Sequence, residues 1–179
     1  FRSLEAGFRF VKPTIEDFFE GTDHAAVDRL DLHRYMGTWY EIARFDHRFE
    51  RGLSEVTATY TLMPDGTVRV ENRGCKHKKP YDVCKTAEGR AKIPDPSQPG
   101  KLKVSFFLSF YSDYYVLELD QDEYNYALIG SSSDKYLWIL SRAPILPEEI
   151  KKKLLDAATR RGYDVKKLIW VEQREKKIM

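Results

Sequence analysis

Two cysteines carry the most evident chemistry in this sequence of 179 residues. Cys75 and Cys84 lie close together along the chain and could form one disulfide bond in an oxidising compartment. Alternatively, Cys75 could remain free and act as a catalytic nucleophile. The short separation favours the disulfide, so we expect a structural bond rather than a catalytic thiol, and we do not expect an enzyme.

The other residues with catalytic or ligating potential do not form a recognisable site. The histidines lack the spacing of metal ligands, and the cysteines have no matching histidine pair. No serine lies in the Gly-x-Ser-x-Gly sequence of a nucleophile elbow. We therefore expect neither a metal nor a cofactor. The histidines concerned are His24, His33, His47 and His77.

The charge of the chain argues against nucleic acid as a partner. The net charge is only +2, which is too close to neutral for a surface that binds a polyanion. One basic segment is the Lys-His-Lys-Lys run at residues 76–79. Such a run is usually solvated, and the functional alternative is contact with the headgroups of anionic lipids. No run of apolar residues approaches the length of a membrane span.

Trp39 and Arg142 are expected to meet in the folded chain. Gly37-Thr38-Trp39 opens the first predicted strand, and Arg142 directly follows another. A guanidinium group over an indole face gains about 0.5–2 kcal/mol. We interpret Gly37, Trp39 and Arg142 as a structural set that closes one end of the fold without touching a ligand.

Alternation of apolar and polar side chains with a period of two predicts eight strands. Most are joined by short turns such as Pro64-Asp65-Gly66, whereas residues 74–85 are predicted to form a longer basic loop bounded by the cysteines. The predicted strands are residues 37–46, 56–62, 68–71, 86–93, 101–106, 113–119, 124–130 and 136–141.

One amphipathic helix follows the strands at residues 147–161, and a short final strand is predicted at 168–171. Pro147 suits the first helical position, and Gly162 suits the end. A single helical turn is expected at 31–36. We divide the chain into an N-terminal extension (1–24) with a short helical turn near 14–20, one domain (25–173) and a charged tail (174–179).

Eight antiparallel strands at this spacing form either a β-sandwich or a closed up-and-down barrel. A closed barrel has no exposed sheet edges, and eight strands leave an interior that can hold one small ligand. We therefore predict an all-β protein, an eight-stranded antiparallel up-and-down barrel with the helix packed outside.

The alternation also predicts which side chains line the interior. Small residues beside large ones, among them Gly89, would leave space for an apolar ligand, with hydroxyl groups near the mouth for its polar end. The alternative is that the same side chains fill the barrel. We expect a cavity lined by Ala58, Tyr60, Val70, Ala87, Ala91, Val104, Phe106, Tyr114, Val116, Tyr136 and Trp138.

Two carboxylates, Glu41 and Glu118, share the parity of the inward positions. A buried carboxylate needs a partner. We expect each to pair with Arg69, Arg90 or a tyrosine hydroxyl, unless it lies solvated near a rim.

Three short motifs resemble those of the lipocalin family, in the same order: Gly37-Thr38-Trp39, Ser112-Asp113-Tyr114 and Ser141-Arg142. The longer run at residues 39–53 is similar to the bacterial outer-membrane members of that family and to their relative apolipoprotein D. The resemblance covers about residues 27–173.

This resemblance implies that the protein binds and carries a fatty acid or a lysophospholipid in the cell envelope, in the periplasm or at the outer membrane. Bacterial members commonly carry a lipid on an N-terminal cysteine. No cysteine precedes Cys75 here, so such an anchor either lay upstream of this sequence or never existed. The alternatives are a carrier of a tetrapyrrole, retinoid or carotenoid, and an enzyme that acts on a lipid through Cys75. We expect a monomer or a homodimer.

Overall fold

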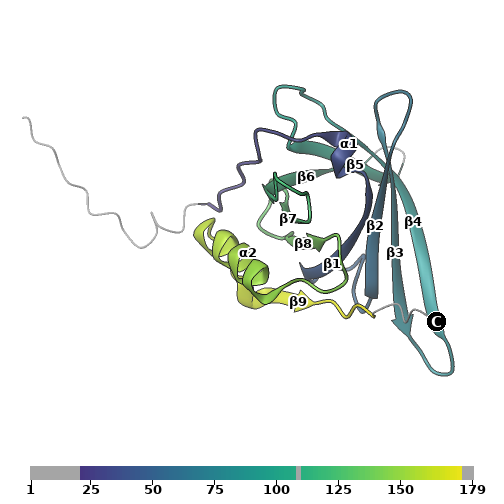
Figure 1. Cartoon of the computed structure of the whole chain (residues 1–179). Coiled ribbons are helices and arrows are strands. Elements are labelled where there is room, and N and C mark those ends of the chain that lie inside the picture. The colour runs from purple at the N-terminus through teal and green to yellow at the C-terminus, as the bar shows by residue number, and fades with distance from the viewer. Residues whose placement is uncertain (1–20, 108–109, 175–179) are drawn as a thin grey trace, which may run out of the picture.

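The computed structural model of the protein describes residues 21–107 and 110–174. These residues form one nine-stranded sheet of order β2-β3-β4-β5-β6-β7-β8-β1-β9, and a further pairing of β2 with β1 closes the first eight strands into a barrel (Figure 1). Neighbouring strands are antiparallel, as in the pairing of β3 with β4, so the predicted eight-stranded antiparallel barrel is confirmed. The strands are β1 (Gly37–Phe45), β2 (Ser54–Leu62), β3 (Val68–His77), β4 (Asp82–Lys92), β5 (Lys101–Phe107), β6 (Phe110–Leu119), β7 (Tyr126–Gly130), β8 (Trp138–Ser141) and β9 (Leu168–Trp170).

Helices lie at one end and on one side of the barrel. The one-turn helix α1 (Leu32–Tyr35) lies at one end, and its N-cap Asp31 accepts backbone N–H groups from the first turn. The helix α2 (Glu148–Arg160) lies outside the wall, as predicted (Figure 1). Pro147 is its N-cap rather than its first helical residue. A 3₁₀ turn, η1 (Val165–Lys167), leads into β9, which pairs with β1 outside the barrel.

Buried apolar side chains form two layers separated by the barrel wall. One layer lines the interior and includes Trp39 and Val116. The other lies between the wall and α2 and includes Leu117, Leu154 and Ala158. Val116 and Leu117 are neighbours in β6 yet belong to different layers, because successive side chains of a strand point to opposite faces.

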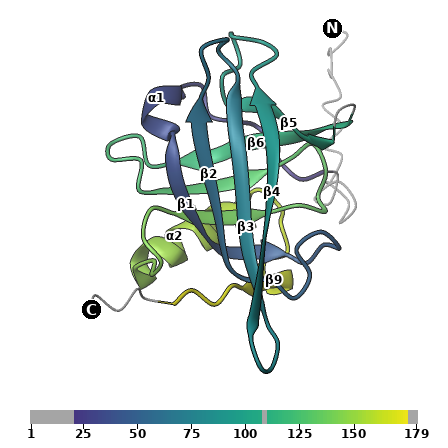
Figure 2. The ribbon, with the colours of Figure 1, turned by 90° about the vertical axis from the view of Figure 1, so that its right-hand side faces the viewer.

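The segment predicted as a basic loop is instead the end of a long hairpin. β3 continues to His77 and β4 begins at Asp82, with Cys75 paired directly opposite Cys84. Figure 2 shows this hairpin extending past β9 at the bottom of the molecule. The alternation failed as a signal here because the first seven residues of β4 are exposed, so no face demands apolar side chains.

Several expectations fall on residues outside the described part of the chain. These are most of the N-terminal extension, with the helical turn near 14–20, and the end of the charged tail, residues 175–179. Within the described ranges, no helix has both the length and the apolar character needed to cross a bilayer.

Candidate binding site inside the barrel

The closed end of the barrel is built on the pair expected from the sequence. The guanidinium carbon of Arg142 lies 3.9 Å from the ring centroid of Trp39. Arg142 also donates hydrogen bonds to the backbone carbonyls of Arg34 (2.7 Å), Thr38 (3.2 Å) and Tyr124 (3.2 Å), and so ties together the segments that meet at this end.

Gly37 makes this approach possible. Its φ of +97° lies in the region that favours glycine, and a Cβ there would lie 3.3 Å from Nη1 of Arg142. Trp39 is fully buried, and its indole N–H donates to the carbonyl of Tyr35 in α1. The two residues and the glycine therefore hold α1 against the end of the barrel.

Most of the side chains predicted to line a cavity lie in the interior layer. Their parity is therefore the one that the alternation indicated, although their contact with a ligand remains a prediction. They are Ala58, Tyr60, Val70, Ala91, Val104, Phe106, Tyr114, Val116 and Trp138.

Two of the predicted lining residues, Ala87 and Tyr136, do not belong to the buried interior cluster. Ala87 is exposed, although it sits opposite Asn72 and shares the parity of the inward positions. In the described part of the chain β4 pairs with β5 at Arg90, Ala91 and Lys92, and Ala87 lies outside that pairing. Tyr136 precedes β8 instead of belonging to it, and it stacks on Trp138 with ring centroids 5.8 Å apart.

The small residues do not all leave the space that the sequence suggested. A Cβ on Gly89 would lie 2.5 Å from the carbonyl oxygen of Ser105 and 2.8 Å from the ring of Phe106. The position is therefore filled by β5, and glycine is needed for close packing of the wall. Ala58 and Ala91 remain as small side chains inside the barrel.

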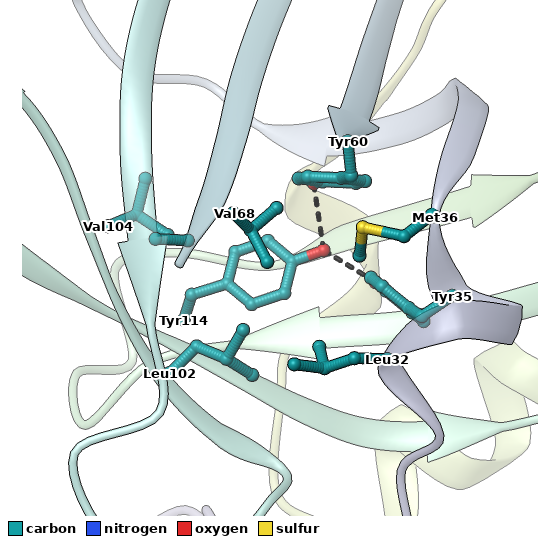
Figure 3. Close-up of a pocket in the computed structure, with 9 residues that line it drawn as sticks. Leu32, Tyr35, Met36, Tyr60, Val68, Leu102, Val104 and Tyr114 are labelled. Atoms are coloured by element: carbon teal, nitrogen blue, oxygen red, sulfur yellow. Dashed lines mark hydrogen bonds between the residues drawn. The ribbon is translucent and has the colours of Figure 1, made fainter. Parts of the chain in front are cut away.

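Three tyrosines, one of them from α1, form a floor at the closed end of the interior (Figure 3). The hydroxyl of Tyr114 is hydrogen-bonded to those of Tyr35 (2.5 Å) and Tyr60 (2.9 Å). Burial raises the pKa of each phenol, so these groups stay neutral and act as a hydrogen-bonded unit. The hydroxyls thus lie at the closed end, whereas the sequence suggested the mouth.

The pocket at this floor is small. Its volume is about 10 Å³, which is about the space of one water molecule. Tyr35 was missed as a lining residue because it precedes the first strand, although the helical turn expected at 31–36 could have placed it here. The other lining side chains are Leu32, Met36, Val68, Ala91, Leu102 and Val104.

A buried carboxyl pair links the interior to the β1–β2 loop. Glu41 in β1 accepts a hydrogen bond from Arg44 (3.1 Å), and its carboxyl group is hydrogen-bonded to that of Glu50 in the loop. Glu50 also accepts from the indole N–H of Trp138 (3.0 Å) and bonds to His47 (2.7 Å). This network fastens the loop to the wall of the barrel at the end opposite α1.

The two carboxyl groups have opposite pKa shifts. Burial and the charge of Glu50 raise the pKa of Glu41 well above its usual range, despite the nearby Arg44. Burial alone would also raise the pKa of Glu50, but hydrogen bonds from His47 and Glu41 lower it to about 2. Glu50 is therefore the stronger acid of this coupled pair.

The predicted partners of Glu41 and Glu118 were wrong for a common reason. β1 has a register shift between Glu41 and Ala43, so Arg44 faces inward together with Glu41. β6 has a shift between Val116 and Glu118, and Glu118 pairs with Arg161 (3.3 Å) beside α2. A bulge changes the parity of every later residue, and the sequence pattern carries no sign of either bulge.

The cysteines and a cluster of ionic side chains hold the base of the β3–β4 hairpin. Cys75 is buried and joined to Cys84 by a disulfide. Beside it, Arg174 lies within 3.2 Å of Asp82 and 3.0 Å of His77. His77, Asp82 and Glu55 have ligand atoms within 4.8 Å of one another, a set that a divalent cation could share. The sequence spacing missed this set because its members come from three different strands.

Comparisons with known proteins agree with this architecture. A family model described as a lipocalin-like domain matches residues 30–173. The chain is 50% identical over 147 residues to the outer membrane lipoprotein Blc of Escherichia coli strain K12, which covers 82% of this chain and 81% of the relative. It is 34% identical to mouse apolipoprotein D, over 82% of this chain and 78% of the relative. Among solved structures, insecticyanin from the tobacco hornworm Manduca sexta matches with a TM-score of 0.69 and 23% identity, over 87% of each chain.

Proposed function

Because this chain belongs to the lipocalin family, we propose that its barrel binds a fatty acid or a lysophospholipid and carries it in the cell envelope. The observation that carries the proposal is the closed barrel with an apolar inner layer, in which Val70, Ala91 and Val104 face a common interior. Such an interior suits an acyl chain, which gains free energy from each methylene group removed from water.

The floor of the barrel limits where an acyl chain can lie. With only about 10 Å³ free beside Tyr60 and Tyr114, no chain fits at the closed end next to these side chains. We therefore place the acyl chain between the tyrosine floor and the opposite end, where Trp138 and the β1–β2 loop lie. Its polar end would point out of the barrel, near the exposed inner face around Ala87.

The bonded cysteines support a carrier over an enzyme. A sulfur atom in a disulfide is not a thiolate and cannot act as the nucleophile that the enzymatic alternative requires. A carrier of a tetrapyrrole, retinoid or carotenoid would use the same kind of apolar interior. Chemical identification of the bound ligand distinguishes this alternative from a lipid carrier.

The location in the cell envelope rests on the relatives. The proteins from Escherichia coli and Vibrio cholerae that match at 50% and 46% identity are both outer membrane lipoproteins by name. An oxidising compartment also agrees with the disulfide between Cys75 and Cys84. Attachment through an N-terminal lipid, and a monomeric or homodimeric state, remain predictions.

Native mass spectrometry of the purified protein, followed by extraction with organic solvent, tests the proposal. We expect an added mass that extraction removes and identifies as a fatty acid or a lysophospholipid. A coloured extract would instead assign a tetrapyrrole or carotenoid. A protein that carries no extractable lipid and does not displace a fluorescent fatty acid would refute the proposal.

A further inference from the structure

The β3–β4 hairpin extends further than closure of the barrel requires. β4 pairs with β5 only at Arg90, Ala91 and Lys92, so its first residues have β3 as their described strand neighbour. The stretch from Asp82 to Glu88 is exposed throughout. Figure 2 shows the resulting arm extending past β9.

The arm combines positive charge with exposed apolar side chains. Tyr81, in the turn, is 79% exposed, and Val83 in β4 is 55% exposed. In residues 74–85, which we call the arm, the acidic residue is Asp82, which is paired with Arg174 (3.2 Å) and with His77 (2.8 Å). The lysines therefore give the arm a net positive charge; they are Lys76, Lys78, Lys79 and Lys85.

The base of the arm is held in place. The disulfide between Cys75 and Cys84 joins the two strands, with two residues between each cysteine and the turn. Arg174 contacts His77 and Asp82, the last pair before the turn, and so fastens it to the C-terminal segment. The turn at residues 78–81 is thus carried by strands that are already held in place. Binding through this turn therefore costs little conformational entropy.

A second exposed aromatic side chain lies at the same end of the barrel. Because neighbouring strands are antiparallel, the β1–β2 loop and the β3–β4 turn lie at the same end. Phe49 in that loop is 57% exposed, and the guanidinium of Arg48 lies 4.8 Å from its ring centroid. A Cβ on Gly52 of the loop would lie 3.9 Å from Cε of Lys76, so the loop and the arm adjoin.

We propose that the β3–β4 arm, together with Phe49, docks the end of the barrel opposite α1 onto a bilayer that contains anionic phospholipids. The lysines attract the negative surface, and the tyrosine and phenylalanine rings suit the headgroup region, where one side of a ring is apolar and the other is wet. This contact is independent of a lipid anchor and of which ligand the barrel holds.

Co-sedimentation of the 179-residue chain with vesicles tests the proposal. Vesicles of phosphatidylcholine alone are compared with vesicles of equal parts phosphatidylcholine and phosphatidylglycerol. We expect binding to the anionic vesicles only, weakened at high salt because the Debye length shortens. The double variant Lys78→Glu/Lys79→Glu should bind roughly 25-fold more weakly, since each basic residue at such a surface contributes about fivefold.

A matched control changes two exposed basic residues on α2, on another side of the molecule. Lys152→Glu/Arg160→Glu alters the net charge by the same amount and should bind like the parent. Tyr81→Ala keeps every charge and should bind several-fold more weakly.

Three results would overturn the proposal: equal binding to both kinds of vesicle, equal loss in both double variants, or no loss in Lys78→Glu/Lys79→Glu. Fatty-acid displacement without vesicles is measured on the same proteins. It should be unchanged in both double variants, so that failure of the docking surface is distinguished from failure of ligand binding.

Discussion

Replacing Arg142 with alanine should destabilise the barrel by removing the side chain that ties its closed end together. The guanidinium contact with Trp39, at 3.9 Å, is worth about 0.5–2 kcal/mol. The hydrogen bonds to the carbonyls of Arg34, Thr38 and Tyr124 each contribute roughly 0.5–1.5 kcal/mol. Arg142 is only partly buried and water can replace some of these bonds, so we expect a loss of about 2–4 kcal/mol in the free energy of unfolding.

Equilibrium unfolding in urea, followed by far-ultraviolet circular dichroism, measures this loss as a lower midpoint. Arg142→Lys keeps the charge but loses the planar guanidinium group that reaches several carbonyls. Its urea midpoint should therefore lie between those of the parent and Arg142→Ala. Arg69→Ala is a matched control, since Arg69 makes only exposed ion pairs with Glu71 and Glu88 and should cost at most about 1 kcal/mol. An Arg142→Ala midpoint no lower than that of Arg69→Ala would contradict the assigned role.

Further predictions concern the interior, the disulfide and acid stability. Val104→Gln places an amide in the apolar interior and should weaken fatty-acid displacement at least roughly tenfold, whereas Lys103→Gln, on the other face of β5, should bind like the parent. Equal binding by both would mean that the ligand lies elsewhere. The bond between Cys75 and Cys84 should raise the free energy of unfolding by about 2–3 kcal/mol, measured as the shift in urea midpoint on reduction; two free thiols in periplasmically expressed protein would exclude it. Because the pKa of Glu50 is lowered from 4.5 to about 2, its carboxylate stabilises the fold above pH 4.5, and this contribution is lost as pH falls towards 2. The free energy of unfolding of Glu50→Gln should therefore fall less than that of the parent over this pH range. Parallel profiles of unfolding free energy against pH for the two proteins would argue against the buried network.

Local pattern predicted the strands of the barrel, and the motifs that resemble those of the lipocalins predicted the pair at its closed end. Strands with one face buried must alternate, and that alternation placed Tyr60, Val70 and Val104 on the inner face. Arg142 is far from Gly37 and Trp39 in the sequence, and it was the resemblance of these motifs to those of the lipocalins that implied their meeting. The helix after the strands was predictable because its apolar stripe has to cover the outside of the wall.

The tertiary structure alone decided the features that depend on which segments become neighbours. The bulges in β1 and β6 shift side chains between faces, so Glu41 pairs with Arg44 and Glu118 with Arg161. Whether a small residue leaves space depends on what packs against it. Phe106 fills the position beside Gly89, while Ala87, outside the described pairing of β4 with β5, is exposed.

The β3–β4 arm is the clearest case in which hydrophobic alternation did not predict the strands. Its residues were predicted as a loop because charged side chains occupy both faces. They are nevertheless strands, held by the pairing of β3 with β4 and by the disulfide across them. Hydrophobic alternation indicates burial on one face of a sheet, so the first seven residues of β4, all exposed, leave no such pattern in the sequence.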